Sequence, residues 1–435
     1  MTDERVGEAK LEAGRRPLRI LAVGNMYPPQ HAGGYELMWQ FAMRHARALG
    51  HRVRVLTSDY VGHSGRAEED PDVYRSLRWY WDLARYEFPS LSLADRVRLE
   101  RHNACILRRH LEDYRPDVVA WWSMGCMSLS LIEQARRRGF PAVFVVHDDW
   151  LVYGFIEDRW LRTWTGPRRG LLAPFAERLF GIPTSVDLAR AGPFVFNSQY
   201  TRDRARAERR DGLPATVIHP GVMERFLEPL PAHPWRWRFA YIGRIDRMKG
   251  IDTAIAALAH LPESATLAIW GSGDARYIAE MQALAAGLDV AGRVSFCGFL
   301  SEDGLRGAYE AADAVIFPVR WNEPFGLVPL EAMGVGRPVV TTARGGTAEY
   351  VRDRENALIF AADDVMGLVQ RLTCLAHDAS LRARLIEDGF RTAERFTASA
   401  FAERTVAEIE RAAGGAGRVV PQVRVTAGGP LGQRR

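Results

Sequence analysis

The chain has 435 residues, of which 47% are hydrophobic, so it is long enough for two packed domains of roughly 200 residues each. Its formal net charge is +5, and the excess lies in the first half: residues 1–218 carry 33 Lys and Arg against 27 Asp and Glu, whereas residues 219–435 carry 25 against 26. This excess is small and no nucleic-acid-binding motif accompanies it, which argues against a nucleic-acid-binding protein. A basic face could attract an anionic lipid or a phosphorylated molecule, although solvated helix surfaces explain the excess more simply.

The terminal segments and the cysteines of the chain indicate where in the cell the protein is expected. No run of about 18 apolar residues is present, so we expect no transmembrane helix. Residues 1–17 are charged and lack the apolar segment of a secretory signal, so we expect a disordered leader there and a disordered Gly-rich tail over residues 414–435. Four cysteines lack metal-ligand spacing, which favours reduced thiols and a cytoplasmic location: Cys105, Cys126, Cys297 and Cys374.

The first half of the chain alternates apolar, strand-like runs with helical patterns, which is typical of a parallel α/β sheet. The expected strands cover residues 18–24, 52–57, 116–122, 142–146 and 194–197. The expected helices cover residues 34–49, 95–114, 128–138 and 199–211. We therefore expect a doubly wound domain over residues 18–220.

The second half shows the same alternation after a boundary at residues 220–234, where prolines and glycines cluster. The expected strands cover residues 239–242, 266–270, 294–296, 314–318 and 338–341, and helices begin near Gly250, Ala275, Ser301 and Phe325. Later helices are expected over residues 363–377, 379–396 and 399–413. The second domain then covers residues 235–397, with a final helix over 398–413. Two doubly wound sheets predict a ligand site between the carboxyl ends of their strands.

Two glycines follow the first expected strand. Gly33 and Gly34 lie where a glycine would let backbone N–H groups approach a phosphate or a sugar closely. An ordinary strand-to-helix turn is the alternative. The segment is not Gly-x-Gly-x-x-Gly, which argues against a dinucleotide-dependent oxidoreductase.

A histidine and two aspartates end the fourth expected strand. A neutral His147 could donate a hydrogen bond to a sugar hydroxyl, although a structural histidine is the usual alternative. Asp148 and Asp149 could orient an acceptor hydroxyl or cap the helix that follows. Trp150 opens an aromatic-rich stretch whose rings could stack on a sugar, lie at a membrane interface or pack in the core.

The chain has two lysines, Lys10 in the expected leader and Lys249. Lysine is a compact point charge, whereas arginine is a rigid planar fork, so a single lysine in an arginine-rich domain is notable. Lys249 follows a strand in the segment Gly243-Arg244…Lys249-Gly250, where Arg244 and Lys249 could hold a diphosphate. A solvated basic loop is the alternative. Gly271 follows the next strand and could shape a base pocket or simply form a turn.

Two carboxylates, Glu323 and Glu331, stand eight residues apart around an expected helix start. Pro324 suits the first helical position, and the following residues would then present free N–H groups to a phosphate. Glu331 would lie about 12 Å along the helix and could accept a hydrogen bond from a ribose, while Glu323 accepts one from a sugar. A helix with an acidic N-terminus is the alternative. The residues that would present the N–H groups are Phe325, Gly326 and Leu327.

A third glutamate stands in Gly345-Gly346-Thr347-Ala348-Glu349, where Glu349 could accept from donor hydroxyls. The ordered set Gly-Arg…Lys-Gly, Glu-x7-Glu and Gly-Gly-x-x-Glu resembles the retaining GT-B glycosyltransferases of family 4, also described as glycosyl transferases group 1. The resemblance covers about residues 18–412. It implies two Rossmann-like domains that face each other across a cleft, with the last helix packing back on the first domain.

The resemblance also implies a reaction, the retaining transfer of a hexose from a UDP- or GDP-linked sugar to a hydroxyl of a glycan, lipid-linked or small-molecule acceptor. Arg244, Lys249 and the N–H groups of residues 325–327 would stabilise the departing diphosphate. Glu323 would position the sugar, Glu331 would hold the ribose, and His147 would lie beside the transferred hexose. Residues 121–124 read Trp-Trp-Ser-Met, where many relatives have a histidine, so the acceptor cannot be taken from them.

No metal is expected, because basic groups could neutralise the diphosphate, and Asp70-Pro71-Asp72 is the only Asp-x-Asp. The expected partners are a nucleotide sugar, a hydroxyl acceptor and an anionic membrane at its inner face, without nucleic acid. A phosphorylase would need a lysine for pyridoxal phosphate. A sugar-nucleotide epimerase would share the nucleotide site, and a non-catalytic sugar-nucleotide-binding protein is a further hypothesis. The motifs do not specify the donor base, the sugar, the acceptor or the oligomeric state.

Overall fold

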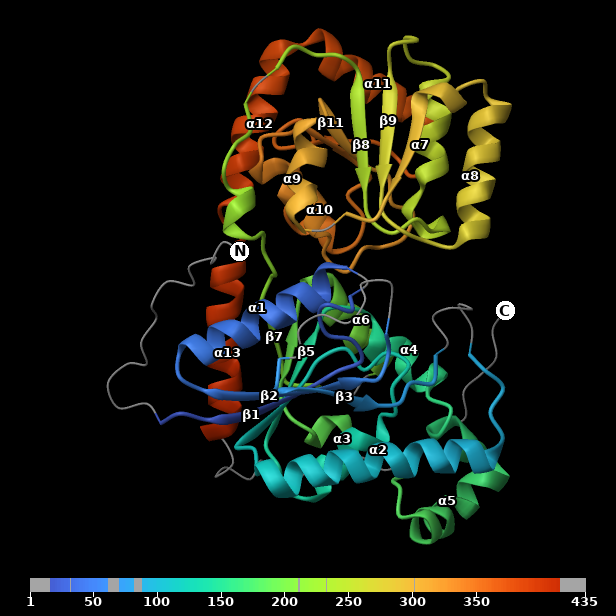
Figure 1. Ribbon diagram of the computed structural model, residues 1–435, viewed down its shortest axis with the longest axis vertical. Coiled ribbons are helices and arrows are strands. Elements are labelled where there is room, and N and C mark those ends of the chain that lie inside the picture. Colours follow the sequence, from blue (N-terminus) through green and yellow to red (C-terminus); the bar gives the residue numbers. More distant parts are fainter. Residues whose placement is uncertain are drawn as a thin grey trace.

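The computed structural model describes residues 16–31, 33–61, 70–81, 88–209, 212–231, 233–300 and 302–414. Apart from residues 16, 17 and 414, the predicted leader and tail lie outside the described residues. The chain forms two lobes, each built on a parallel β-sheet with helices on its faces (Figure 1). This arrangement confirms the predicted α/β fold of two doubly wound domains. Among the described residues, no helix has both the length and the apolar character needed to cross a membrane.

The N-terminal lobe contains seven parallel strands in the order β3-β2-β1-β4-β5-β6-β7. The central strands are continuous apolar runs because both faces of the sheet are covered, as is usual for parallel sheets. The strands are β1 (Arg19–Val23), β2 (Arg52–Ser58), β3 (Val73–Leu77), β4 (Val118–Trp121), β5 (Ala142–Val146), β6 (Phe194–Phe196) and β7 (Ala215–Val217). The helices are α1 (Gly34–Ala48), α2 (Leu93–Tyr114), α3 (Ser130–Arg137), α4 (Trp150–Glu157), α5 (Pro167–Phe180) and α6 (Gln199–Arg209).

The C-terminal lobe contains six parallel strands in the order β10-β9-β8-β11-β12-β13. The strands are β8 (Arg238–Ile242), β9 (Thr266–Trp270), β10 (Val294–Gly298), β11 (Ala314–Phe317), β12 (Val339–Thr341) and β13 (Leu358–Ile359). The helices are α7 (Ile251–Leu258), α8 (Ala275–Gly287), α9 (Glu302–Glu310), α10 (Leu327–Gly334), α11 (Val365–His377), α12 (Ala379–Ala393) and α13 (Ala398–Gly414).

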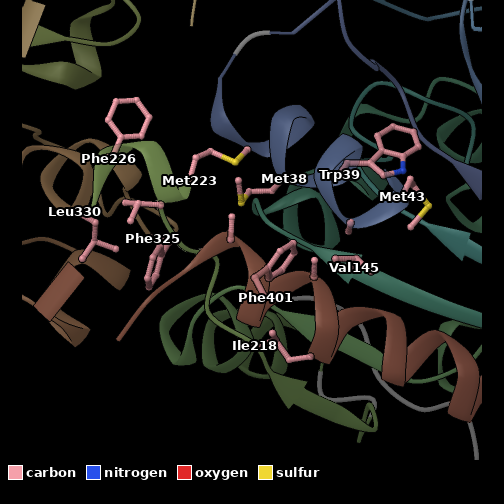
Figure 2. Close-up of a cluster of buried hydrophobic side chains, with 14 of the residues drawn as sticks. Met38, Trp39, Met43, Val145, Ile218, Met223, Phe226, Phe325, Leu330 and Phe401 are labelled. Atoms are coloured by element: carbon pink, nitrogen blue, oxygen red, sulfur yellow. The ribbon is translucent and has the colours of Figure 1, made fainter. Parts of the chain in front are cut away.

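Helix α13 belongs to the C-terminal part of the sequence but lies along α1 in the N-terminal lobe (Figure 1). The chain crosses between lobes beside residue Val222, whose N–H donates to Phe396 O at 2.9 Å and whose carbonyl accepts from Ala398 N at 2.8 Å. Figure 2 shows one buried cluster that runs from α1 past Phe401 of α13 to Leu330 of α10. Burial of a side chain such as Phe401 contributes roughly 1.5–3 kcal/mol, so α13 stabilises the association of the two lobes.

Candidate functional site

Lys249 and Glu323 form an ion pair at the carboxyl edge of the C-terminal sheet. Lys249 Nζ lies 2.7 Å from Glu323 Oε2, and the indole N–H of Trp321 donates to the same oxygen at 2.6 Å. Both charged side chains are largely buried, and the ammonium also lies over the rings of Trp321 and Phe317 at 5.2 and 5.7 Å from their centroids. The structure therefore brings together two residues 74 positions apart that the sequence analysis assigned to one site.

The backbone around Lys249 fixes its position. It ends the short 3₁₀ helix η4 (Arg247–Lys249), which begins with the side chain of Asp246 accepting from Met248 N at 2.9 Å. Gly250 follows with φ 67°, and a Cβ there would lie 2.1 Å from Pro318 O. Only glycine fits this left-handed close approach, so the Lys-Gly pair places the ammonium against the loop after β11.

Arg244 and Gly271 lie on the two loops after β8 and β9. The Arg244 side chain is about half exposed and lies 3.5 Å from Asp246 Oδ2, so its guanidinium remains accessible to a ligand. Gly271 has φ 146°, and a Cβ there would lie 1.8 Å from Gly243 O. Gly271 is thus required by the contact between these loops, and its predicted role in a base pocket stays a prediction.

Helix α10 begins at Leu327, so the predicted start near Phe325 is wrong by two residues. Glu323 instead pairs with Gly345 in a short parallel bridge, and Glu323 O accepts from Gly346 N at 2.7 Å. A Cβ at Gly346 would lie 2.1 Å from Pro324 O, so the Gly345-Gly346 pair packs directly on this loop. Residues 323–326 therefore form a loop that is held by tertiary contacts, and a local helix signal does not contain those contacts.

The residues after Glu323 have different environments. Phe325 is buried, and its ring lies 5.1 Å from that of Tyr350, so its side chain belongs to the core. Gly326 has φ 85° and precedes the helix, and Leu327 is its first residue. The N-terminus of α10 therefore follows the Lys249–Glu323 pair directly, where backbone N–H groups and the helix dipole favour an anion.

Glu331 lies on α10, where Tyr309 OH donates to its Oε2 at 2.7 Å. Burial and the neighbouring carboxylate raise the pKa of Tyr309 well above its ordinary value, so the phenol stays a donor. This hydrogen bond orients the carboxylate on the helix that carries the anion-binding end. The predicted ribose contact of Glu331 stays a prediction.

The N-terminus of α1 meets that of α10 across the two lobes. A Cβ at Gly34 would lie 2.6 Å from Leu327 Cδ1, so these helix starts are in contact. Gly33 N donates to Glu36 Oε2 at 3.2 Å at the start of α1. Two positive helix ends thus meet at this contact, and the loop that carries Glu323, the partner of Lys249, leads into one of them, an arrangement that favours an anion.

Gly33 is not required by the described structure, and this motivates a specific test. No heavy atom lies within 4 Å of a Cβ built there, and its φ of 178° is extended backbone that any residue adopts. We expect Gly33→Ala to change the free energy of unfolding by less than about 1 kcal/mol. If a ligand approaches this backbone closely, the variant raises the donor KM by about tenfold or more.

The comparison variant is Gly34→Ala, which must displace Leu327 and should lower both stability and donor affinity. Denaturant unfolding and donor titration of both variants separate the two effects. An unchanged donor KM in Gly33→Ala would contradict a ligand role for this glycine.

His147 lies beyond the end of β5, buried against α1 and α13. Its ring stacks on Tyr35 at 4.7 Å and meets Phe401 edge-on at 5.1 Å. Its Nε2 atom has no hydrogen-bond partner among the described residues. Burial lowers the pKa of His147 to about 3, so the imidazole is neutral at ordinary pH. Because the Nε2 atom is buried, the predicted contact of His147 with a sugar hydroxyl stays a prediction.

The neighbouring predicted acceptor residues are held by protein groups. Asp148 Oδ2 accepts from Tyr153 OH at 2.6 Å, and burial raises the Asp148 pKa to about 6. Asp149 precedes α4 and pairs with Arg204 of α6 at 2.9 Å. Trp150 is fully buried in the N-terminal core beside Phe144 and therefore presents no face to a sugar. Of the roles considered for Trp150, the structure shows packing in the core.

Glu349 connects the two lobes. Its carboxylate accepts from Tyr200 N at 2.8 Å and lies 2.8 Å from His219 Nε2. Burial alone would raise its pKa, but the hydrogen bonds from His219 and from Tyr200 N and Gln199 N outweigh burial and lower it. The predicted hydroxyl contact of Glu349 stays a prediction, because Oε1 already holds the start of α6 and Oε2 pairs with His219. His219 had no motif that marked it in the sequence.

The described part of the chain holds no cluster of three or more His, Cys, Asp or Glu side chains arranged to bind a metal ion. Asp70 of the Asp-x-Asp segment instead pairs with Arg47 at 2.7 Å. Burial alone would raise the pKa of Asp70, but the hydrogen bonds from Arg47 and from Asp72 N, together with the charges of Arg47 and Arg44, outweigh burial and lower the pKa. This carboxylate is therefore held as an anion by a protein cation.

Two family models match consecutive parts of the chain. The model described as Glycosyltransferase Family 4 matches residues 32–226, and the model described as Glycosyl transferases group 1 matches residues 225–392. The point where the two matches meet lies beside the crossing at Val222.

Curated relatives match over parts of their length. A D-inositol 3-phosphate glycosyltransferase of Xylanimonas cellulosilytica is 32% identical over 222 residues, which are 51% of this chain and 48% of that protein. The chain thus spans about half the length of that relative. The sulfoquinovosyl transferase SQD2 of Arabidopsis thaliana is 25% identical over 376 residues, 85% of this chain and 69% of that protein.

Solved structures share the fold over most of the chain. Sucrose-phosphate synthase from Thermosynechococcus elongatus superposes with a TM-score of 0.68 at 19% identity, covering 91% of this chain and 98% of the other. Anabaena Alr3699/HepE in complex with UDP and glucose gives a TM-score of 0.63 at 20% identity, covering 91% and 99%. At these identities the likeness supports the two-lobed architecture alone.

Proposed function

Because the chain belongs to the GT-B glycosyltransferases of group 1, we propose that it transfers a hexose from a nucleoside diphosphate sugar to a hydroxyl, with retention at the anomeric carbon. The observation that carries this proposal is that Lys249 pairs with Glu323 on the loop before the N-terminus of α10, and that the first residue of α10 contacts the start of α1. A diphosphate is the anion that such an arrangement of N–H groups and a compact cation suits.

In the proposed reaction, the acceptor oxygen forms a bond to the anomeric carbon as the bond from that carbon to the diphosphate oxygen breaks. The bonding electrons leave with the diphosphate, and the acceptor proton passes to the leaving group or to water. Lys249, Arg244 and the α10 N–H groups stabilise the charge that develops on the diphosphate, the main contribution expected of a preorganised site. No metal is required in this proposal.

Glu323 has a positioning role in this proposal. Its Oε2 is already bound by Lys249 Nζ and Trp321 Nε1, so it is a poor candidate for a nucleophile. Its other oxygen would accept from a sugar hydroxyl. Glu331 on the same element would accept from the ribose. Retention then follows from same-face attack through an oxocarbenium-like state, without a covalent intermediate on the protein.

The acceptor is proposed by class only. A relative that is named for D-inositol 3-phosphate makes a phosphorylated alcohol one acceptor to test, beside glycan and lipid-linked alcohols. The basic excess of the first half suits an anionic acceptor or a peripheral contact with the inner face of an anionic membrane. We place the protein in the cytoplasm because its four cysteines are free thiols.

A panel of UDP-, GDP-, ADP- and dTDP-sugars, measured by thermal stabilisation, tests the donor site. We expect one base to raise Tm in the wild type, with the shift lost in Lys249→Ala and Glu331→Ala. A shift that survives in both variants would place the nucleotide elsewhere. Absence of any shift in a folded sample would contradict the proposed donor class.

A further inference from the structure

Helix α5 in the N-terminal lobe exposes large apolar side chains. Leu171 is 83% exposed and Phe175 68%, and Leu172 and Leu179 are each more than half exposed. Leu171, Phe175 and Leu179 recur every fourth residue, so they form one row along the helix. We refer to these four residues as the α5 face.

The distribution of side chains on α5 is the inverse of a helix packed on a core. Small Ala176 is buried, and the helix is anchored by Phe180, whose ring lies 6.0 Å from that of Trp160. The larger leucines and Phe175 point to solvent instead. Amphipathic helices of soluble domains normally bury the larger apolar residues, whereas this face is left exposed by the described part of the fold.

The α5 face is the one concentration of this kind in the described chain. In the described part of the chain, ten large hydrophobic residues are exposed, and four of these ten lie on α5. A fifth, Ile156, lies near the end of α4, which continues toward α5 through the short helix η1 (Leu161–Trp164). The remaining five are scattered over other segments, which is normal for a protein surface.

Arginines flank the apolar row. Arg168, Arg169 and Arg178 all lie on α5 with exposed side chains. The one acidic residue of the helix, Glu177, forms an ion pair with Arg137 of α3 and accepts a hydrogen bond from Thr184 N at 3.1 Å. The exposed surface of α5 thus has an apolar row with cationic side chains beside it. This pattern complements anionic lipid and not an apolar protein groove.

The position of α5 suits a membrane contact. Figure 1 shows α5 at the end of the N-terminal lobe that lies away from the C-terminal lobe, so a surface docked there leaves the proposed donor lobe accessible. Helix α4, which leads toward it, begins directly after Asp148 and Asp149, the predicted acceptor side of the site. The chain therefore connects the α5 face to the acceptor side through α4 and η1.

We propose that α5 docks this protein on an anionic membrane, with its apolar face at the boundary of headgroups and acyl chains and its arginines on lipid phosphates. This inference names the surface for the membrane contact and rests on that part of the proposed function. It does not depend on the identity of the donor, because docking requires neither lobe to hold nucleotide.

Co-sedimentation of the full chain with vesicles tests the proposal. The wild type is expected to bind vesicles of phosphatidylcholine mixed with phosphatidylglycerol, more weakly at high salt, and to bind phosphatidylcholine alone far less. Combined Leu171→Ser, Phe175→Ser and Leu179→Ser should lower the partition coefficient by at least about tenfold. Each of Arg168→Glu, Arg169→Glu and Arg178→Glu should lower it by about fivefold or more.

Matched controls come from the C-terminal lobe. Met366→Ser removes an apolar residue that is half exposed on α11, and Arg391→Glu reverses an exposed charge on α12; neither should change vesicle binding. Unchanged donor-induced thermal stabilisation in the triple serine variant shows that the donor lobe is intact, so a failure of docking stays distinct from a failure of the transferase proposal.

Three outcomes would overturn the inference. One is a wild type that does not bind anionic vesicles, and another is equal binding by the triple serine variant. The third is a wild-type dimer that becomes monomeric in that variant while vesicle binding persists, which would assign the α5 face to a second copy of the chain.

Discussion

Replacing Lys249 with alanine is expected to lower kcat/KM for the nucleotide sugar by about 10²–10³-fold, the size of effect seen when one preorganised donor to a developing anion is removed. The variant also leaves Glu323 with a single described donor, Trp321 Nε1, in a largely buried position. An unpaired buried carboxylate destabilises a protein and repels an incoming diphosphate. Donor affinity by calorimetry and release of nucleoside diphosphate measure the two consequences separately.

Two variants isolate the role of the ammonium. Arg247→Ala removes a cation from the same 3₁₀ helix, but Arg247 is exposed and pairs with Glu280, so we expect activity within about threefold of wild type. Lys249→Arg keeps the charge but places a planar fork between the rings of Phe317 and Trp321, and it should restore little activity. Activity of Lys249→Ala near that of wild type would remove this residue from the site.

The buried strands were the most predictable part of the fold. Residues 142–146 and 266–270 were predicted as strands with the same bounds that β5 and β9 have. Both segments are short runs rich in apolar residues, fully buried in β5 and alternately buried in β9, so the signal is local. The edge strand β3 was missed because its sequence, Val-Tyr-Arg-Ser-Leu, mixes polar and apolar residues and is mostly only partly buried.

Helix α5 was missed for a different reason. Gly170 and Pro174 interrupt its sequence, and both residues disfavour a helix interior. Its large apolar residues face solvent, so their positions do not report a buried stripe. The exposure of these large apolar side chains removed the helical pattern from the sequence. In the structure, the same exposure identifies the α5 face.

The candidate site was predictable where its parts are adjacent in sequence. The Lys-Gly step and the two carboxylates were identified from motifs, but the contact of Lys249 with Glu323 depends on how β8 and β11 pair. The start of α10 depends on Gly345 and Gly346, which lie about twenty residues later. The role of His219 beside Glu349 depends on both lobes at once, so no single segment contains it.

The contribution of His147 to the stability of the folded protein is expected to fall as the solution becomes acidic. Burial lowers its pKa to about 3, whereas a histidine in an unfolded chain has a pKa near 6.5. Between these values the unfolded state binds the proton and the folded state does not, so stability is lost as the pH falls from about 6.5 toward 3. This single group should cost about 2 kcal/mol at pH 5 relative to pH 7.5.

Urea unfolding of wild type and His147→Gln at both pH values measures this contribution. Glutamine does not titrate. The loss of stability of the His147→Gln variant between pH 7.5 and 5 should therefore be smaller than that of wild type by about 2 kcal/mol. Asp148, whose pKa is raised to about 6 by burial, has the opposite slope, but it is present in both proteins and largely cancels in the difference. Equal losses in the two proteins would mean that the ring can be protonated in the folded state, and then His147 must reach water or an acceptor despite Tyr35 and Phe401.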